Sequence, residues 1–235
     1  MLKRSWWISL FVLLLLLGGL GGAGYGVLSH QPAFYLEAQV SIGQAREQAS
    51  RDFEQRVIGL ANDATYSREW KFSCTTEQIN SYFVEDFLKT QLSKMLPSHI
   101  HDLRLQFHND EVQIGFQYGR GQVTSVISLH LKAWLAQRDP NTLVIEVISL
   151  KAGAMPIAIK AFHEEIAEQL RSLNIKALWY RKEGHPTLVM KFQADRREAS
   201  FHFKHLEISQ GRFYLEGETL DPEAPSSTKP VVSQK

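Results

Sequence analysis

An uncharged apolar run near the N-terminus constrains this chain more than any other feature. It extends from Trp6 to Leu28, follows the basic pair Lys3 and Arg4, and is followed by no charge until Glu37. As a helix it would span roughly 34 Å, enough to cross a bilayer core of about 30 Å. The run therefore predicts a single-pass anchor in the cell (inner) membrane, with a cytoplasmic N-terminus and an extracytoplasmic remainder.

The same residues also have the layout of a cleavable signal peptide. Its apolar core would be Ile8–Leu17, and small residues at Gly21–Ala23 would provide the cleavage site. We favour the uncleaved anchor because Tyr25, Val27 and Leu28 continue the apolar run beyond that site. In either case the rest of the chain is exported.

Three glycines of the run lie four residues apart and share one face of the predicted helix. Gly18, Gly22 and Gly26 form a doubled small-xxx-small pattern, which allows close packing of two membrane helices. The general abundance of glycine in membrane helices is the simpler explanation, because other glycines of the run lie off this face. The three glycines are nevertheless candidate helix-packing positions.

Length, charge and cysteine content restrict what the exported part can be. About 200 residues follow the anchor, which suits one ordinary domain. Lys+Arg 26 against Asp+Glu 25 leaves a formal charge of +1, so the composition gives no reason to expect nucleic acid as a partner. Cys74 is the single cysteine, so no internal disulfide is available and a core must hold the fold.

Changes in composition divide the chain into four parts. Residues 1–29 form the cytoplasmic N-terminus and anchor, and residues 30–68 form a stalk with an amphipathic helix. Residues 69–220 form the exported α+β domain, and residues 221–235 have the composition of a disordered tail.

Two helices are expected before the strands begin. Ser41 and Gln44 have capping-box spacing, and the stretch Ile42–Leu60 has the apolar rhythm of an amphipathic helix. That helix either docks on the exported domain or belongs to a stalk. Thr75 and Gln78 repeat the capping-box spacing before a second helix.

The middle of the chain alternates between apolar and polar residues with period two. Short turns separate its strands, which predicts an antiparallel meander. An amphipathic helix over Pro156–Leu173 is expected to lie across this meander. The fold class is therefore α+β, an antiparallel sheet curved around that helix with further N-terminal helices. The expected strands cover residues 103–107, 112–118, 123–131, 143–147, 177–181, 187–192, 200–208 and 211–216.

Motifs of catalysis are missing from the sequence. It has no phosphate-binding loop, no nucleophile elbow and no zinc-binding helix of the H-E-x-x-H type. We therefore expect no catalytic residue, no metal site, no cofactor and no enzymatic activity.

The aromatic and aliphatic content is the most suggestive feature of the exported part. A long sheet with apolar helix stripes can enclose a groove for a lipid or another apolar ligand, although plain core packing explains the same residues. The candidate groove walls are Phe116, Tyr118, Leu129, Leu131, Phe162 and Ile166.

The anchor, the segment TTEQIN at residues 75–80 and the segment ISLKAGAMPIAI at residues 148–159 together resemble the YpmS-like family of single-anchor bacterial membrane proteins. The resemblance covers the order of elements over about half of the exported part and supplies no catalytic residues. It implies a non-enzymatic, membrane-tethered domain.

Our first hypothesis for the function is thus a membrane-anchored binding module for an apolar ligand. The alternative is a cell-envelope scaffold, a homo-oligomer or the partner of another envelope protein, that assembles through its helices.

Overall fold

The computed structural model describes residues 26–90, 99–120, 123–139, 141–173, 175–192 and 200–220. Within them the chain forms two antiparallel sheets and several helices, which confirms the predicted α+β class. Most of the predicted anchor, including Gly18 and Gly22, lies outside the described residues, as does the tail 221–235. No helix in the described part is both long and apolar enough to cross a bilayer.

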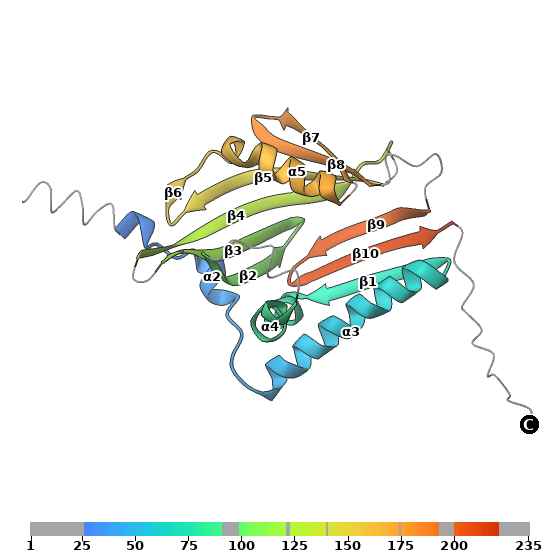
Figure 1. Cartoon of the computed structure of the whole chain (residues 1–235), viewed down its shortest axis with the longest axis horizontal. Coiled ribbons are helices and arrows are strands. Elements are labelled where there is room, and N and C mark those ends of the chain that lie inside the picture. The colour runs from blue at the N-terminus through green and yellow to red at the C-terminus, as the bar shows by residue number, and fades with distance from the viewer. Residues whose placement is uncertain are drawn as a thin grey trace, which may run out of the picture.

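The larger sheet contains the predicted meander and continues beyond it. Its strand order is β2-β3-β4-β5-β8-β7, every neighbouring pair is antiparallel, and β6 pairs with the end of β5. Figure 1 shows these strands as one layer. Their bounds are β2 Ile100–His108, β3 Glu111–Arg120, β4 Val123–Leu135, β5 Thr142–Ala152, β6 Met155–Pro156, β7 Ile175–Lys182 and β8 His185–Phe192.

The smaller sheet joins segments that lie far apart in the chain. Strand β10 (Arg212–Thr219) lies between β1 (Glu69–Thr75) and β9 (Phe201–Ser209), and both pairs are antiparallel. Glu69 pairs with Glu218 and Thr75 with Arg212, so β1 is matched to β10 along its whole length.

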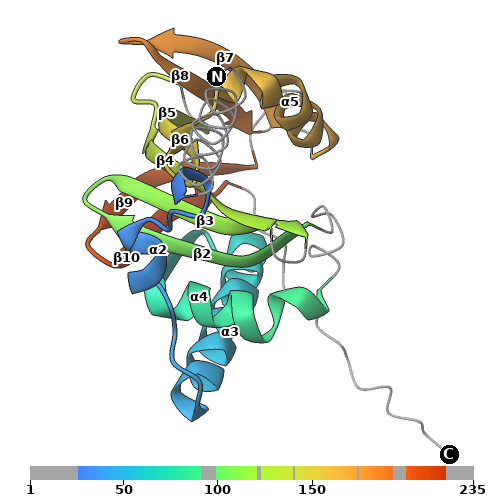
Figure 2. The ribbon, with the colours of Figure 1, turned by 90° about the vertical axis from the view of Figure 1, so that its left-hand side faces the viewer.

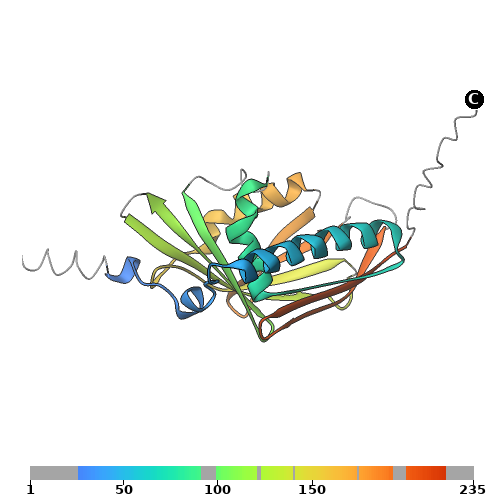
Figure 3. The same cartoon turned by 90° about the horizontal axis from the view of Figure 1, so that it is seen from below.

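The helices lie at two ends of the molecule. Helices α3 (Gln44–Tyr66) and α4 (Thr76–Glu85) lie at one end and α5 (His163–Ser172) at the other (Figure 2). Viewed from below, α4 and α5 lie on the same side of the large sheet (Figure 3). Shorter helical segments are α2 (Ala33–Glu37), η1 (Phe87–Lys89) and η3 (Ile159–Phe162).

One of the two predicted capping boxes forms. The Gln78 backbone N–H donates to Thr75 Oγ1 at 3.1 Å, and the Thr75 backbone N–H donates to Gln78 Oε1 at 3.0 Å. The box predicted at Ser41 is wrong, because α3 begins at Gln44 without a side-chain cap. Gly43 precedes it with a φ of 147°, a conformation that favours glycine and prevents the helix from starting earlier.

The prediction of a helix from Pro156 is also wrong at its start. Met155 and Pro156 pair with β5, and the Ile157 backbone N–H still donates to the Leu150 carbonyl at 2.8 Å. These bonds hold the segment in an extended form, so the α-helix begins only at His163. Helix α5 packs against β7, at the edge of the sheet.

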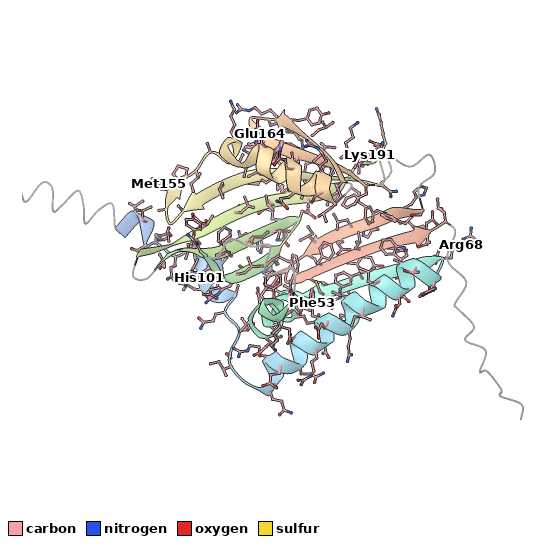
Figure 4. The ribbon with its side chains drawn as sticks, in the orientation of Figure 1. Phe53, Arg68, His101, Met155, Glu164 and Lys191 are labelled. Carbon is pink, nitrogen blue, oxygen red and sulfur yellow. The ribbon has the colours of Figure 1, made fainter. Side chains whose placement is uncertain are left out.

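Helix α3 docks on the rest of the domain, against α4 and β1. The Phe53 ring lies 6.3 Å from the Phe72 ring of β1 and 5.0 Å from the Tyr82 ring of α4, centroid to centroid. Figure 4 shows Phe53 at this junction. Arg46 also donates to Glu85 at 2.6 Å. Of the two alternatives for this helix, docking is what the structure shows.

Two buried asparagine side chains tie the sheets and helices together. Asn80 Nδ2 of α4 donates to the Leu105 carbonyl, and the Leu105 backbone N–H donates to Asn80 Oδ1, both at 2.8 Å. Asn141, before β5, donates to the Phe201 carbonyl at 2.5 Å and accepts from the Phe203 backbone N–H at 3.0 Å. Each side-chain amide thus pairs with one backbone N–H and one backbone carbonyl of a neighbouring strand, β2 for Asn80 and β9 for Asn141.

Glycine at position 217 is required by packing. A Cβ there would lie 2.2 Å from Trp70 Cζ2 and 2.7 Å from the His202 carbonyl oxygen. Because the ring of Trp70 is buried, Gly217→Ala should destabilise the protein by about 2 kcal/mol, lowering Tm by roughly 4–8 °C. Thermal unfolding of the full-length protein, followed by near-ultraviolet circular dichroism, measures this change in Tm.

Gly59→Ala is the matched control. Gly59 lies within α3 and no atom would be within 4 Å of its Cβ, so alanine should raise stability by up to about 1 kcal/mol. Equal shifts of Tm in the two variants would contradict the close packing at Gly217.

Candidate functional site

An apolar cavity of about 420 Å³ lies between the two sheets. One wall is the face of the large sheet that carries Leu105, Val112, Leu131 and Ile145, which we call the inner face. Side chains from five strands of this sheet line it, namely Leu105, Phe107, Val112, Leu131, Ala133, Leu135, Leu143, Ile145 and Phe192.

The opposite wall comes from the small sheet and from two helices. The Phe107 and Phe213 rings, one from each sheet, stack with centroids 5.7 Å apart and hold the walls together at one side. The residues of this second wall are Phe53, Phe72, Cys74, Ile79, Phe203, Leu206, Ile208, Phe213 and Leu215.

The chemistry of the cavity is almost entirely that of hydrocarbon. None of the eighteen described residues that line it carries a charge, and among them Cys74 has the only side chain with a reactive atom. Burial raises the pKa of the Cys74 thiol to about 12, so the thiol stays protonated at neutral pH and is not a nucleophile. The arrangement can bind an apolar molecule.

The volume of the cavity falls within the range of small-molecule binding pockets. Small-molecule pockets commonly measure about 300–1,000 Å³, and an engineered apolar cavity of about 150 Å³ already admits benzene. A cavity of about 420 Å³ therefore has room for a longer apolar molecule.

Four of the predicted groove residues lie on the inner face, as their alternation requires. Leu131 lines the cavity itself. Phe116 and Leu129 are half-buried further along the same face, and Tyr118 is 48% exposed near its end. The structure thus places Leu131 at the cavity and the other three predicted residues on the same face of β3 and β4.

The remaining predicted positions lie elsewhere. Ile166 is half-buried in α5, and Phe162 belongs to η3, with its side chain outside the described residues. Gly26 lies in the first described helical turn, and no atom would be within 4 Å of its Cβ.

Sequence reasoning missed the entire second wall. The alternation of Leu206 with Ile208 and of Phe213 with Leu215 does show that these strands have an apolar face. No local pattern, however, shows that this face lies opposite the meander.

The most buried carboxylate among the described residues, that of Glu146, belongs to an ion-pair cluster on the other face of the large sheet. Glu146 Oε1 lies 2.7 Å from His185 Nδ1, and Glu146 Oε2 lies 3.5 Å from Lys182 Nζ. The hydrogen bond from His185, aided by the charge of Lys182, lowers the pKa of Glu146 below its usual value. Lys182 also lies over the Trp134 ring at 4.5 Å. The cluster is thus a satisfied structural network.

No group of three or more His, Cys, Asp or Glu side chains is arranged to hold a metal ion within the described ranges. Comparison with known proteins gives no relative, since no protein-family model, no characterised protein and no solved structure matches the chain.

The state of Cys74 can be tested by alkylation, because it is the only cysteine. With a pKa of about 12, its thiolate population at pH 8 is about 10³-fold below that of an ordinary thiol. We expect iodoacetamide to modify the native full-length protein at least that much more slowly than the denatured protein, as measured by intact mass.

A chain with Cys74→Ala and Leu178→Cys provides the comparison, since Leu178 is 46% exposed. Native labelling of Cys74 as fast as labelling at this position would show that the cavity wall is open to solvent.

Proposed function

We propose that this protein is a membrane-anchored extracytoplasmic module that binds a lipid or another apolar ligand. The observation that carries the proposal is the cavity of about 420 Å³, whose described lining residues are all apolar. Protein interiors are normally close-packed, and wall atoms that face an empty space lose their dispersion contacts. A hydrocarbon chain in the cavity would restore those contacts without leaving a polar group unsatisfied.

The attachment of the first described residues supports a location at the membrane surface. The Ala154 backbone N–H donates to the Val27 carbonyl at 2.8 Å, and Ser125 Oγ donates to the Leu28 carbonyl at 2.7 Å. Val27 and Leu28 end the apolar run, so an anchor formed by that run would leave no free linker before the domain. Met155 of β6 lies at this same end of the molecule (Figure 4).

Helix α2 strengthens this attachment. Tyr35 is 1% exposed, its hydroxyl donates to the Asp102 carbonyl at 2.7 Å, and the Arg104 guanidinium lies 4.3 Å from its ring centroid. Gly115 gives the ring room, because a Cβ there would come within 2.5 Å of Tyr35 Cδ2. A tether fixed in this way would hold the domain in one orientation to the bilayer.

A scaffold role in the cell envelope is the second candidate. Two adjacent apolar side chains of α3, Val57 and Ile58, are 42% and 58% exposed, and such residues occur in contacts between proteins. Crosslinking of the protein in its own membrane distinguishes the two roles, because a scaffold yields a dimer or a hetero-complex and a simple binding module yields a monomer.

The binding proposal predicts that filling the cavity removes the ligand. Ala133→Phe adds a ring to the wall of the cavity and should reduce the lipid retained by the full-length protein about 10-fold or more. Native mass spectrometry of protein extracted in mild detergent measures the retained mass. Ala61→Phe, at an exposed position on α3, is the control and should retain lipid like the unchanged protein. If the unchanged protein carries no lipid, the proposal fails.

The anchor can be tested separately. An uncleaved helix over Trp6–Leu28 should keep the protein in the membrane pellet after alkaline carbonate extraction, and the intact mass should include the first residues. Release of the protein into the supernatant, with a mass that lacks those residues, would show that the run is a cleaved signal peptide.

A further inference from the structure

A second cavity, of about 480 Å³, lies beside the first described turn of α5. Val147 and Leu150 of β5 and Ile159 of η3 provide apolar walls. Unlike the cavity between the sheets, this one also has cationic residues in its lining, namely Lys160 and Arg181. No carboxylate is among the described residues that line it, so its electrostatic potential favours an anion.

The two cations have no partner of opposite charge among the described residues. Neither Lys160 nor Arg181 forms an ion pair or a side-chain hydrogen bond within the described part of the chain. Some other lysines of the domain are paired: Lys191 contacts Asp139 at 2.7 Å and Lys204 contacts Glu218 at 2.9 Å. A guanidinium and an ammonium at one cavity are the groups that bind phosphate and carboxylate oxygens in proteins.

His163 provides a third polar group. Its ring stacks on the Trp179 ring, with centroids 3.9 Å apart, and its Nε2 atom is buried without a hydrogen-bond partner in the described structure. Burial, together with the charge of Lys160, lowers the pKa of His163, so the imidazole is neutral near pH 7. Buried polar atoms normally have a partner, and a neutral imidazole with its proton on Nε2 can donate to an anionic oxygen.

The two cavities are neighbours along strand β5. Ile145 lines the apolar cavity and Val147 lines the cationic one. Residues two apart on a strand point to the same face and are separated by roughly 7 Å. A single molecule could therefore place an apolar chain in the cavity between the sheets and an anionic end in the neighbouring cationic cavity.

We propose that the cationic cavity binds the anionic headgroup, a phosphate or a carboxylate, of a lipid whose hydrocarbon chain occupies the cavity between the sheets. This inference rests on the proposed function and makes it more specific: the ligand is an anionic amphiphile. Arg181 and Lys160 supply charge-assisted hydrogen bonds, and His163 supplies a neutral donor.

The experiment compares three defined probes on the full-length protein in a non-ionic detergent. Palmitate has a chain and a carboxylate, hexadecanol has the same chain without charge, and inorganic phosphate has charge without a chain. Titration calorimetry, corrected for partitioning into micelles, gives each affinity. We expect palmitate to bind about 10-fold or more tightly than hexadecanol, and this advantage to shrink as salt is added.

Substitutions in the cationic cavity test whether the tighter binding of palmitate than of hexadecanol arises there. The double substitution Lys160→Ala and Arg181→Ala should lower palmitate affinity to that of hexadecanol and leave hexadecanol binding unchanged. Lys176→Ala with Arg212→Ala removes two exposed cations that line neither cavity and should leave both affinities unchanged.

His163→Phe tests the neutral donor while keeping an aromatic ring against Trp179. It should weaken palmitate several-fold without changing hexadecanol binding. An equal loss for both probes would mean that His163 only supports the local packing.

The outcomes separate the two proposals. Equal binding of palmitate and hexadecanol, unaffected by the double substitution, overturns the headgroup site and leaves the apolar binding function intact. Binding of phosphate alone, lost in the double substitution, overturns both the headgroup site and lipid binding and makes the cavity a site for free anions. If no probe binds, both proposals fail.

Discussion

Two buried carboxamides make the joints on which this structure depends: Asn80 ties α4 to β2 of the large sheet, and Asn141 ties the start of β5 to β9 of the small sheet. Asn80 and Asn141 each offer one donor and one acceptor, the same groups that a peptide unit offers. Each therefore satisfies a strand backbone without adding another strand to it. Within the described residues the sheets share no strand pairing, apart from turn contacts such as the bond from the Asp110 N–H to the Ile208 carbonyl. The surfaces that the two sheets turn toward each other therefore form the two opposite walls of the apolar cavity.

This way of joining the sheets places polar groups at the edges and leaves the space between the sheets apolar. Asn141 fixes the backbone of Phe203, and the Phe203 ring then contacts Phe192 of the large sheet with centroids 5.3 Å apart. Trp70 packs edge-on against the same ring, with centroids 6.0 Å apart. Phe192 and Phe203 both line the cavity, so this aromatic contact forms part of its wall. Side chains of both sheets, among them Ala133 and Leu215, leave a volume of about 420 Å³ between them.

Local patterns in the sequence predicted those elements that interactions between nearby residues determine. The meander from β2 to β5 follows from alternation and short turns, and the start of α4 follows from the Thr75–Gln78 capping box, since both are decided by residues close in the chain. Long-range bonds decided the rest. Nothing near Glu69 shows that it pairs with Glu218, and nothing in the helical stripe after Pro156 shows that Ile157 bonds to Leu150. The same limit applies to the site. Alternation identified Leu131 and its face, whereas the opposing Phe72 and Phe213 required the tertiary fold.

Strand β5 brings the separate parts of the proposed site into one order. Its first residues, including Leu143 and Ile145, line the apolar cavity, and Val147 and Leu150 further along line the cationic cavity. Just after its end, Gly153 has a φ of 58°, and a Cβ there would lie 2.2 Å from the Val27 carbonyl oxygen, so the tether approaches closely at this point (Figure 1). A lipid bound as proposed would hold its headgroup between its hydrocarbon chain and the end of the domain that contacts Val27. Its chain would be shielded from solvent by the two sheets.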